Sequence, residues 1–289
     1  MTDGDHGLFG PGSVTWRVMG EPVMWVGGLR AMYLQALHPR TMRATWQNTA
    51  FAQRGQAWGR FVRTVEFVRV RTYGSTADAE RAGRRVRRIH ASLTGTDADG
   101  SVIRLDEPEL LAWVHCGEVA SYADVARRCG MGLSGADLDA FVAEQRAGAA
   151  LVGLDPGQVP GSMAELGEYY DAMRPRVYAC AEARRALLRS YVPDMPWPYA
   201  GLRLAVPPAN LLAFSCLPRW ARRRYGAPGS PLTDAGATMA LRALHQAVTR
   251  LPRQLVGMPV PPAAAPGPAG TRGPAKVPGP STANEPATA

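Results

Sequence analysis

The apolar residues of this chain recur three and four positions apart in one segment after another, which is the spacing of one face of an α-helix. No segment shows the sustained alternation of apolar and polar residues that marks a half-buried strand. The pattern therefore predicts an all-α fold, a single multi-helix domain with at most a minor hairpin at residues 101–105. Residues 107–128 show the spacing most clearly, with apolar side chains at Leu110, Leu111, Val114, Val119, Tyr122 and Val125.

Residues that begin and end helices refine these segments. The first expected helix, 22–37, ends at His38-Pro39, because proline disfavours helical backbone in the residue before it. Ser75 is expected to cap the third helix, with Asp78 in its first turn. The expected helices are 22–37, 58–73, 76–93, 107–128, 134–151, 162–173, 180–191, 208–214 and 233–251.

The end of the chain differs from the rest in composition. After Gly257 the sequence consists mainly of Pro, Ala, Gly and Thr, with almost no bulky apolar residue, so burial cannot offset the entropy lost on ordering. We expect a helical domain over residues 1–256 and a disordered tail over 257–289.

Several features indicate a cytoplasmic protein. Residues 1–13 carry acids and glycines where an export signal has a basic start and an apolar run. Residues 22–37 contain Arg30 and are shorter than the roughly 20 apolar residues that span a bilayer. The cysteines form no CxxC or CxxCH motif, so we expect buried, reduced thiols at Cys116, Cys129, Cys180 and Cys216.

The net charge of +9 comes from 33 basic residues, of which only Lys276 is lysine. Arginine in place of lysine, beside abundant Ala, Gly and Pro, is typical of codon usage in a GC-rich genome. We expect no nucleic-acid partner, because the chain has no helix-turn-helix signature, no RNP motif and no aromatics interleaved with its arginines. Residues 199–224 fit either weak peripheral contact with a membrane or a core helix with a basic end.

His90 is the most informative residue of the expected third helix. It shares one apolar stripe with Ala79, Ala82, Gly83 and Val86, while arginines occupy most of the other positions, so it points inward. A core histidine bonded to a backbone carbonyl and a ligand of haem iron both fit this position. The small residues on the stripe would let a flat group approach the helix.

The helix before it carries a second group of polar residues. Arg60 and Thr64 share a face with Phe67, and Arg63 lies beside them. They fit either solvated residues near a helix start or donors to a buried anion or bound oxygen, because a buried arginine needs a partner.

Two further histidines are alternatives for a second iron ligand. His38 also fits a helix C-cap, and His115 also fits a core histidine bonded to Glu118. A di-iron carboxylate site is excluded, because it requires two Glu-x-x-His motifs and the sequence contains none. The chain also lacks the GxSxG, GxxxxGK[ST] and HExxH motifs of other enzyme classes, and it has no GxGxxG motif that follows a strand.

Four sequence blocks together resemble the family of haem-dependent oxygenases that includes the bacterial rubber oxygenases (latex-clearing proteins) and the fungal mycophenolate-pathway oxygenase that cleaves a prenyl chain. Weaker similarity continues through YDAMRP (170–175) and the 220–226 region, so the resemblance covers most of the chain before the tail. The blocks are FGPGSVTWRVMGEPVMWVGGLRAMYLQALHPR (9–40), WGRFVRTVEFVRVRTYGSTADAE (58–80), RRVRRIHASLTGTDADG (84–100) and LLAWVHCGEVASY (110–122).

The resemblance implies a helical fold that encloses haem b, with His90 of the RRIHASL block as the axial iron ligand. Arg60 and Thr64 match an Arg-x-x-x-Thr pattern that flanks the haem in rubber oxygenases. The implied chemistry is O2-dependent oxidation, or cleavage of a carbon–carbon double bond, in a hydrophobic substrate of the isoprenoid class. A non-catalytic haem-binding or lipid-binding protein of the same family is the alternative.

Two positions depart from the rubber oxygenases. At the position before Thr64, rubber oxygenases have a lysine that is able to ligate iron in a closed state, whereas this chain has Arg63. They also use a glutamate upstream of the arginine as a base, whereas no Asp or Glu lies between Glu21 and Glu66 here. These departures affect the expected reaction more than the expected binding of haem.

Overall fold

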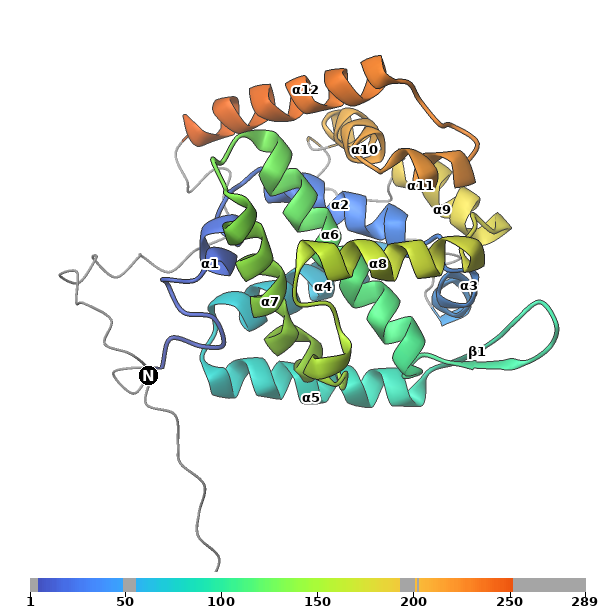
Figure 1. The fold of residues 1–289 in the computed structure, drawn as a ribbon. Helices are drawn as coiled ribbons and strands as arrows, with labels where there is room; N and C mark the ends of the chain where they lie inside the picture. The colour runs from blue at the N-terminus through green and yellow to red at the C-terminus, as the bar shows by residue number, and fades with distance from the viewer. Residues whose placement is uncertain (1–4, 49–55, 193–200, 202, 252–289) are drawn as a thin grey trace, which may run out of the picture.

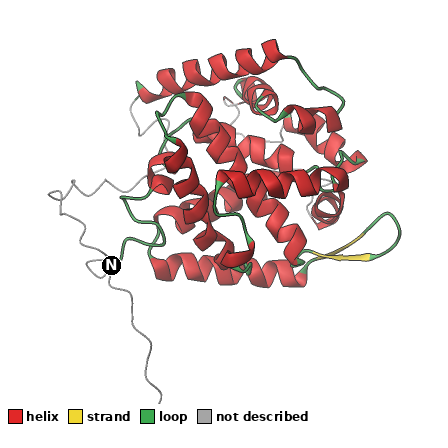
Figure 2. Ribbon diagram, viewed as in Figure 1, coloured by secondary structure: helices red, strands yellow, loops and turns green. Residues whose placement is uncertain are grey.

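The computed structural model describes residues 5–48, 56–192, 201 and 203–251, and most of these lie in helices (Figures 1 and 2). The α-helices are α1 (Val14–Met19), α2 (Met24–Gln35), α3 (Pro39–Asn48), α4 (Gln56–Tyr73), α5 (Thr76–Ser92), α6 (Pro108–Cys129), α7 (Gly135–Leu151), α8 (Met163–Met173), α9 (Ala181–Ser190), α10 (Val206–Ser215), α11 (Arg219–Arg224) and α12 (Pro231–Thr249), with short 3-10 turns η2 (Pro156–Gln158) and η3 (Arg174–Arg176).

The all-α prediction is confirmed, and the predicted hairpin is present. Strand β1 (Thr94–Thr96) pairs antiparallel with β2 (Val102–Arg104), which lies within the predicted 101–105 segment. Ser75 caps α5 as expected, because its side-chain oxygen accepts from the backbone N–H of Asp78. All four cysteines are free and buried.

Three helices were not predicted. One of them, α3, changes the interpretation of Pro39. Pro39 begins α3 rather than only ending the helix before it. The first turn of a helix tolerates proline, since the missing N–H would have no partner inside the helix. The other two, α1 and α11, are only six residues long, too short to show helical periodicity.

The centre of the molecule is the packing of α2 against α6. Gly27 of α2 makes this close approach possible, because a Cβ there would lie 2.7 Å from the ring of Tyr122. Trp113 of α6 is fully buried, and its indole N–H donates to the carbonyl of Gln35 over 2.9 Å. The ring of Trp113 also meets Tyr170 of α8 edge to face, with centroids 5.7 Å apart.

The other helices surround this pair. In the view of Figure 1, α12 lies along the top and α5 along the bottom, with α2 and α6 between them. Among the described residues, none of the helices combines the length and the apolarity needed to cross a bilayer. The predicted tail, 257–289, and part of the 199–224 segment lie outside the described residues.

Candidate functional site

Helices α4 and α5 form a helical hairpin that brings Arg60 and His90 together. The two helices pack against each other and are joined only by Gly74 and Ser75, so they run antiparallel. Arg60 lies 73 − 60 = 13 residues before the end of α4, and His90 lies 90 − 76 = 14 residues after the start of α5. At 1.5 Å per residue, each is about 20 Å from the turn, and the two therefore lie side by side.

His90 is partly buried near the last turn of α5, and its Nδ1 atom is buried without a hydrogen-bond partner in the described part of the chain. Burial lowers the pKa of His90, and the nearby Arg60 charge lowers it further, whereas Asp106 opposes them. The imidazole is therefore neutral at pH 7 and has a nitrogen that is not committed to the protein.

The small residues on the His90 stripe serve helix packing. Ala79 is fully buried, and a Cβ at Gly83 would lie 2.7 Å from the carbonyl oxygen of Leu151 at the end of α7. Arg87 donates to the same carbonyl over 2.6 Å. The space beside Gly83 is thus filled by α7, and the predicted approach of a flat group at this position is wrong.

The three polar residues of α4 considered as site residues differ in their surroundings. Arg60 is partly buried, whereas Arg63 and Thr64 are exposed. Burial and then the neighbouring charge of Arg63 lower the pKa of Arg60. The Thr64 hydroxyl donates to the Arg60 carbonyl over 3.1 Å, so its proton is used within the helix.

An aromatic cluster joins the start of α4 to α2 and was not recognised in the sequence. Phe61 of α4 has its ring centroid 5.6 Å from Trp58 and 6.1 Å from Trp25 of α2. Trp25 remains 42% exposed. No local pattern links α2 to α4, so only the tertiary fold could reveal this apolar contact.

His38 is fully engaged in the protein. Its Nδ1 accepts from the backbone N–H of Thr41 over 3.4 Å, and its Nε2 lies 3.2 Å from Glu109 of α6. Arg176 donates to both oxygens of that glutamate at 2.8 Å. His38 therefore caps the start of α3, rather than the end of α2 as the C-cap interpretation has it, and burial lowers its pKa.

His115 lies in α6, faces the core of the protein and is only 6% exposed. Burial, and secondarily Arg71 of α4, lowers its pKa to about 3. Glu118, the partner expected for it, instead accepts from both terminal nitrogens of Arg71, the shorter of these contacts being 2.5 Å. His115 is therefore a neutral histidine close to a buried Arg–Glu pair.

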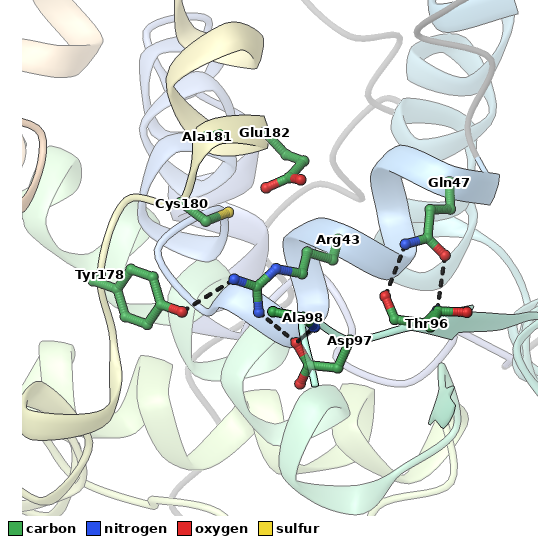
Figure 3. A pocket seen from close by; sticks show the side chains of 9 residues that line it. All are labelled: Arg43, Gln47, Thr96, Asp97, Ala98, Tyr178, Cys180, Ala181 and Glu182. Atoms are coloured by element: carbon green, nitrogen blue, oxygen red, sulfur yellow. Dashed lines mark hydrogen bonds and ion pairs between the residues drawn. The ribbon is translucent and has the colours of Figure 1, made fainter. Parts of the chain in front are cut away.

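A cavity of about 420 Å³ lies on another part of the surface, where α3, the hairpin and the start of α9 meet (Figure 3). Arg43 points into it and bonds to Asp97 and to the hydroxyl of Tyr178, and Glu182 faces it from α9. Gln47 holds the hairpin through both the carbonyl and the N–H of Thr96, each at 2.8 Å. These polar walls do not suit a porphyrin, which needs an apolar slot.

Within the described ranges, no group of three or more His, Cys, Asp or Glu side chains is arranged to hold a bare metal ion. A site with a single histidine ligand fits a metal that brings its other ligands with it, as haem does.

Comparison with known proteins gives one match. Residues 16–250 match the family model described as "ER-bound oxygenase mpaB/B'/Rubber oxygenase, catalytic domain". The match spans α4 and α5, and hence both Arg60 and His90. Comparisons with curated proteins and with solved structures gave no match.

Proposed function

The chain belongs to the family of mpaB and rubber oxygenase catalytic domains, and we propose that it is a haem b-dependent oxygenase with His90 as the iron ligand. The observation that carries this proposal is the buried Nδ1 of His90, which has no hydrogen-bond partner among the described residues. A buried polar atom without a partner is costly, and a ligand atom would remove that cost.

The surroundings of His90 fit haem in two further respects. Neutral imidazole is the form that coordinates iron, and burial together with Arg60 favours it. Arg60 and Arg63 provide positive charge for the propionates, and an anion beside Arg60 would offset both influences that lower its pKa. Trp25, Trp58 and Phe61 offer an apolar wall for the macrocycle or for a hydrophobic substrate.

Haem would supply the iron centre at which O2 is activated. The residues of the chain would then hold the cofactor and orient the oxygen. Arg60 can donate hydrogen bonds to developing negative charge on oxygen, and its partial burial strengthens that interaction. Thr64 would have to release its bond to the Arg60 carbonyl before its hydroxyl could donate in the same way.

Neither alternative for a second histidine ligand is favoured. Both ring nitrogens of His38 already interact with protein groups. Arg71, which acts on His115, lies 71 − 60 = 11 residues along α4 from Arg60, which acts on His90. This separation is about 16 Å along the helix. We therefore propose that His90 would be the single histidine ligand of the haem.

The substrate class is proposed from the family alone, as a hydrophobic molecule with isoprenoid double bonds. Arg63 in place of lysine, and the lack of an acid between Glu21 and Glu66, favour the second candidate function, a haem-binding protein without turnover. Oxygen uptake by hemin-reconstituted protein, measured with polyprenyl and terpenoid substrates, separates the two. We expect substrate-dependent uptake and carbonyl products.

Two variants sharpen this experiment. Arg60→Leu should lower oxygen uptake per mole of bound haem at least ten-fold, because it removes a charged hydrogen-bond donor from the site. Arg88→Leu, which removes an exposed arginine of the neighbouring helix α5, should leave uptake unchanged. Normal haem absorbance without substrate-dependent uptake would identify a binder, and the absence of haem absorbance in the wild type would contradict both functions.

A further inference from the structure

A pocket of about 410 Å³ lies far from the His90 site. α2, α6, the α10–α11 turn, α11 and α12 form its walls, whereas His90 interacts with Asp106 just before the start of α6. Asp124, a wall residue, lies 124 − 108 = 16 residues from the start of α6, which is about 24 Å along the helix. In Figure 1, α12, which contributes to the pocket, and α5, which carries His90, lie on opposite sides of the molecule.

The walls of this pocket are strongly basic. Five arginines and two aspartates line it, which gives a local charge of 5 − 2 = +3. The floor is formed by Cys216, Leu217 and Pro218 of the α10–α11 turn. The charged lining residues are Arg30, Arg127, Arg128, Arg219, Arg242, Asp124 and Asp234.

The two carboxylates are already used within the protein. Asp124 accepts from Arg127 over 2.7 Å and from Arg128 over 3.3 Å. Burial raises the pKa of Asp124, but Arg30 and Arg128 outweigh it, so that the pKa is lowered and the group stays ionised. Asp234 accepts from Arg219 over 2.6 Å and pairs with Arg222, which is fully buried behind the pocket.

Several arginine nitrogens remain available to a ligand. The side chain of Arg30 is only 5% exposed, and its Nε lies 3.6 Å from a carboxylate oxygen of Asp124. Its Nε donates to the Cys216 carbonyl and its Nη1 to Ser121, whereas its Nη2 has no partner among the described residues. Arg242 uses only Nε, to the carbonyl of Arg128, and Arg127 uses only Nη2. Guanidinium nitrogens of this kind, on side chains that line one cavity, can donate to an anion bound there.

The geometry points to a phosphoryl group as that anion. We propose that this pocket binds a phosphate monoester or diphosphate, whose oxygens take the free guanidinium donors of Arg30, Arg127 and Arg242. Guanidinium groups bind phosphate through paired N–H donors, and several converging on one cavity select for multiple negative charge. The volume of the pocket lies in the range of small-molecule sites, and its apolar floor can accept an organic group.

Pyrophosphate binding, measured by calorimetry at constant ionic strength, tests the proposal. The wild type should bind pyrophosphate at one site, and Arg127→Gln/Arg242→Gln should bind at least ten-fold more weakly. Both side chains are exposed at the rim, so the variant should fold. Arg84→Gln/Arg85→Gln removes the same charge from exposed positions of α5 and should bind like the wild type.

Equal binding by the two double variants would overturn the proposal, because it would show only general attraction of anions to a basic protein, and so would the absence of binding by the wild type. Glycerol phosphate and phosphatidic acid vesicles, compared with the same variants, identify the source of the phosphoryl group. Loss of glycerol phosphate binding in the rim variant supports a free phosphate ester, and loss of vesicle binding alone supports a lipid headgroup.

Discussion

The charged side chains buried around α6 and the histidine at the end of α5 differ in how the chain satisfies them. Arg71 is almost fully buried and reaches both oxygens of Glu118 through its terminal nitrogens. His38 is equally buried and has a partner for each ring nitrogen. His90 has a buried Nδ1 to which no described residue bonds; the Nε of Arg71 also lacks a hydrogen-bond partner, but the charge of Arg71 is paired with Glu118.

The difference distinguishes structural polar groups from a group whose partner is to come from outside the chain. Leaving a buried polar atom unpaired costs free energy, so a fold that pairs most of its buried charges has a reason where it does not. We attribute that reason at His90 to a ligand. Around α6, the buried charged groups are paired with other side chains of the protein and contribute to its stability.

The Arg71–Glu118 pair provides the largest expected effect. Glu118→Ala should lower the free energy of unfolding by about 3–5 kcal/mol, because it leaves Arg71 as an uncompensated buried charge. The matched control is Glu66→Ala, which breaks the exposed pair with Arg69 of the same helix and should cost less than about 1 kcal/mol. Urea unfolding measures both, and equal losses would mean that burial does not distinguish the two pairs.

His115 should make stability depend on pH. Its pKa in the folded protein is about 3, against 6.5 for the free side chain, so below pH 6.5 the unfolded chain binds a proton that the folded protein does not. Stability is therefore lost as the pH falls. Between pH 7 and pH 5 this loss is about 2 kcal/mol.

His115→Gln should remove that part of the acid sensitivity. Unfolding free energies at pH 7 and pH 5 give the difference for wild type and variant. His6→Gln, at an exposed position, should keep the wild-type difference. A variant at position 115 as acid-sensitive as the wild type would show that this histidine titrates freely in the folded protein.

The smallest expected effect concerns the coupling of Arg60 and His90. Arg60→Gln should raise the pKa of His90 in the haem-free protein, because it removes a positive charge that disfavours protonation. A proton NMR titration of the His90 ring follows this directly. Arg88→Gln on α5 should have no comparable effect. An unchanged His90 pKa in the Arg60 variant would show that the two residues are not coupled.

Much of the fold could be predicted because its signals are local. The cap of α5 at Ser75 and the apolar stripe of α6 each depend on residues close together in the sequence, and both were predicted. The start of α3 was not predicted, because a proline such as Pro39 can mark either the end of one helix or the first turn of the next. Short helices such as α1 contain too few turns to show a period.

The site was less accessible from the sequence than the fold. Periodicity placed His90 on an inward face but left a structural and a ligand role open. The Nε2 of His38 depends on Glu109, 71 positions along the chain, and the Trp25–Phe61 contact joins residues 36 positions apart (61 − 25). Such long-range contacts have no local signature in the sequence. They distinguish a histidine whose ring nitrogens have partners in the protein from one whose Nδ1 has none.

The central claim is that His90 holds haem, and hemin titration followed by absorbance tests it most directly. The wild type should give a saturable Soret band, and His90→Ala should lose it or shift it markedly, with recovery when free imidazole is added. His38→Ala should keep the wild-type band position if the protein folds. A Soret band and hemin affinity unchanged in His90→Ala would contradict the account.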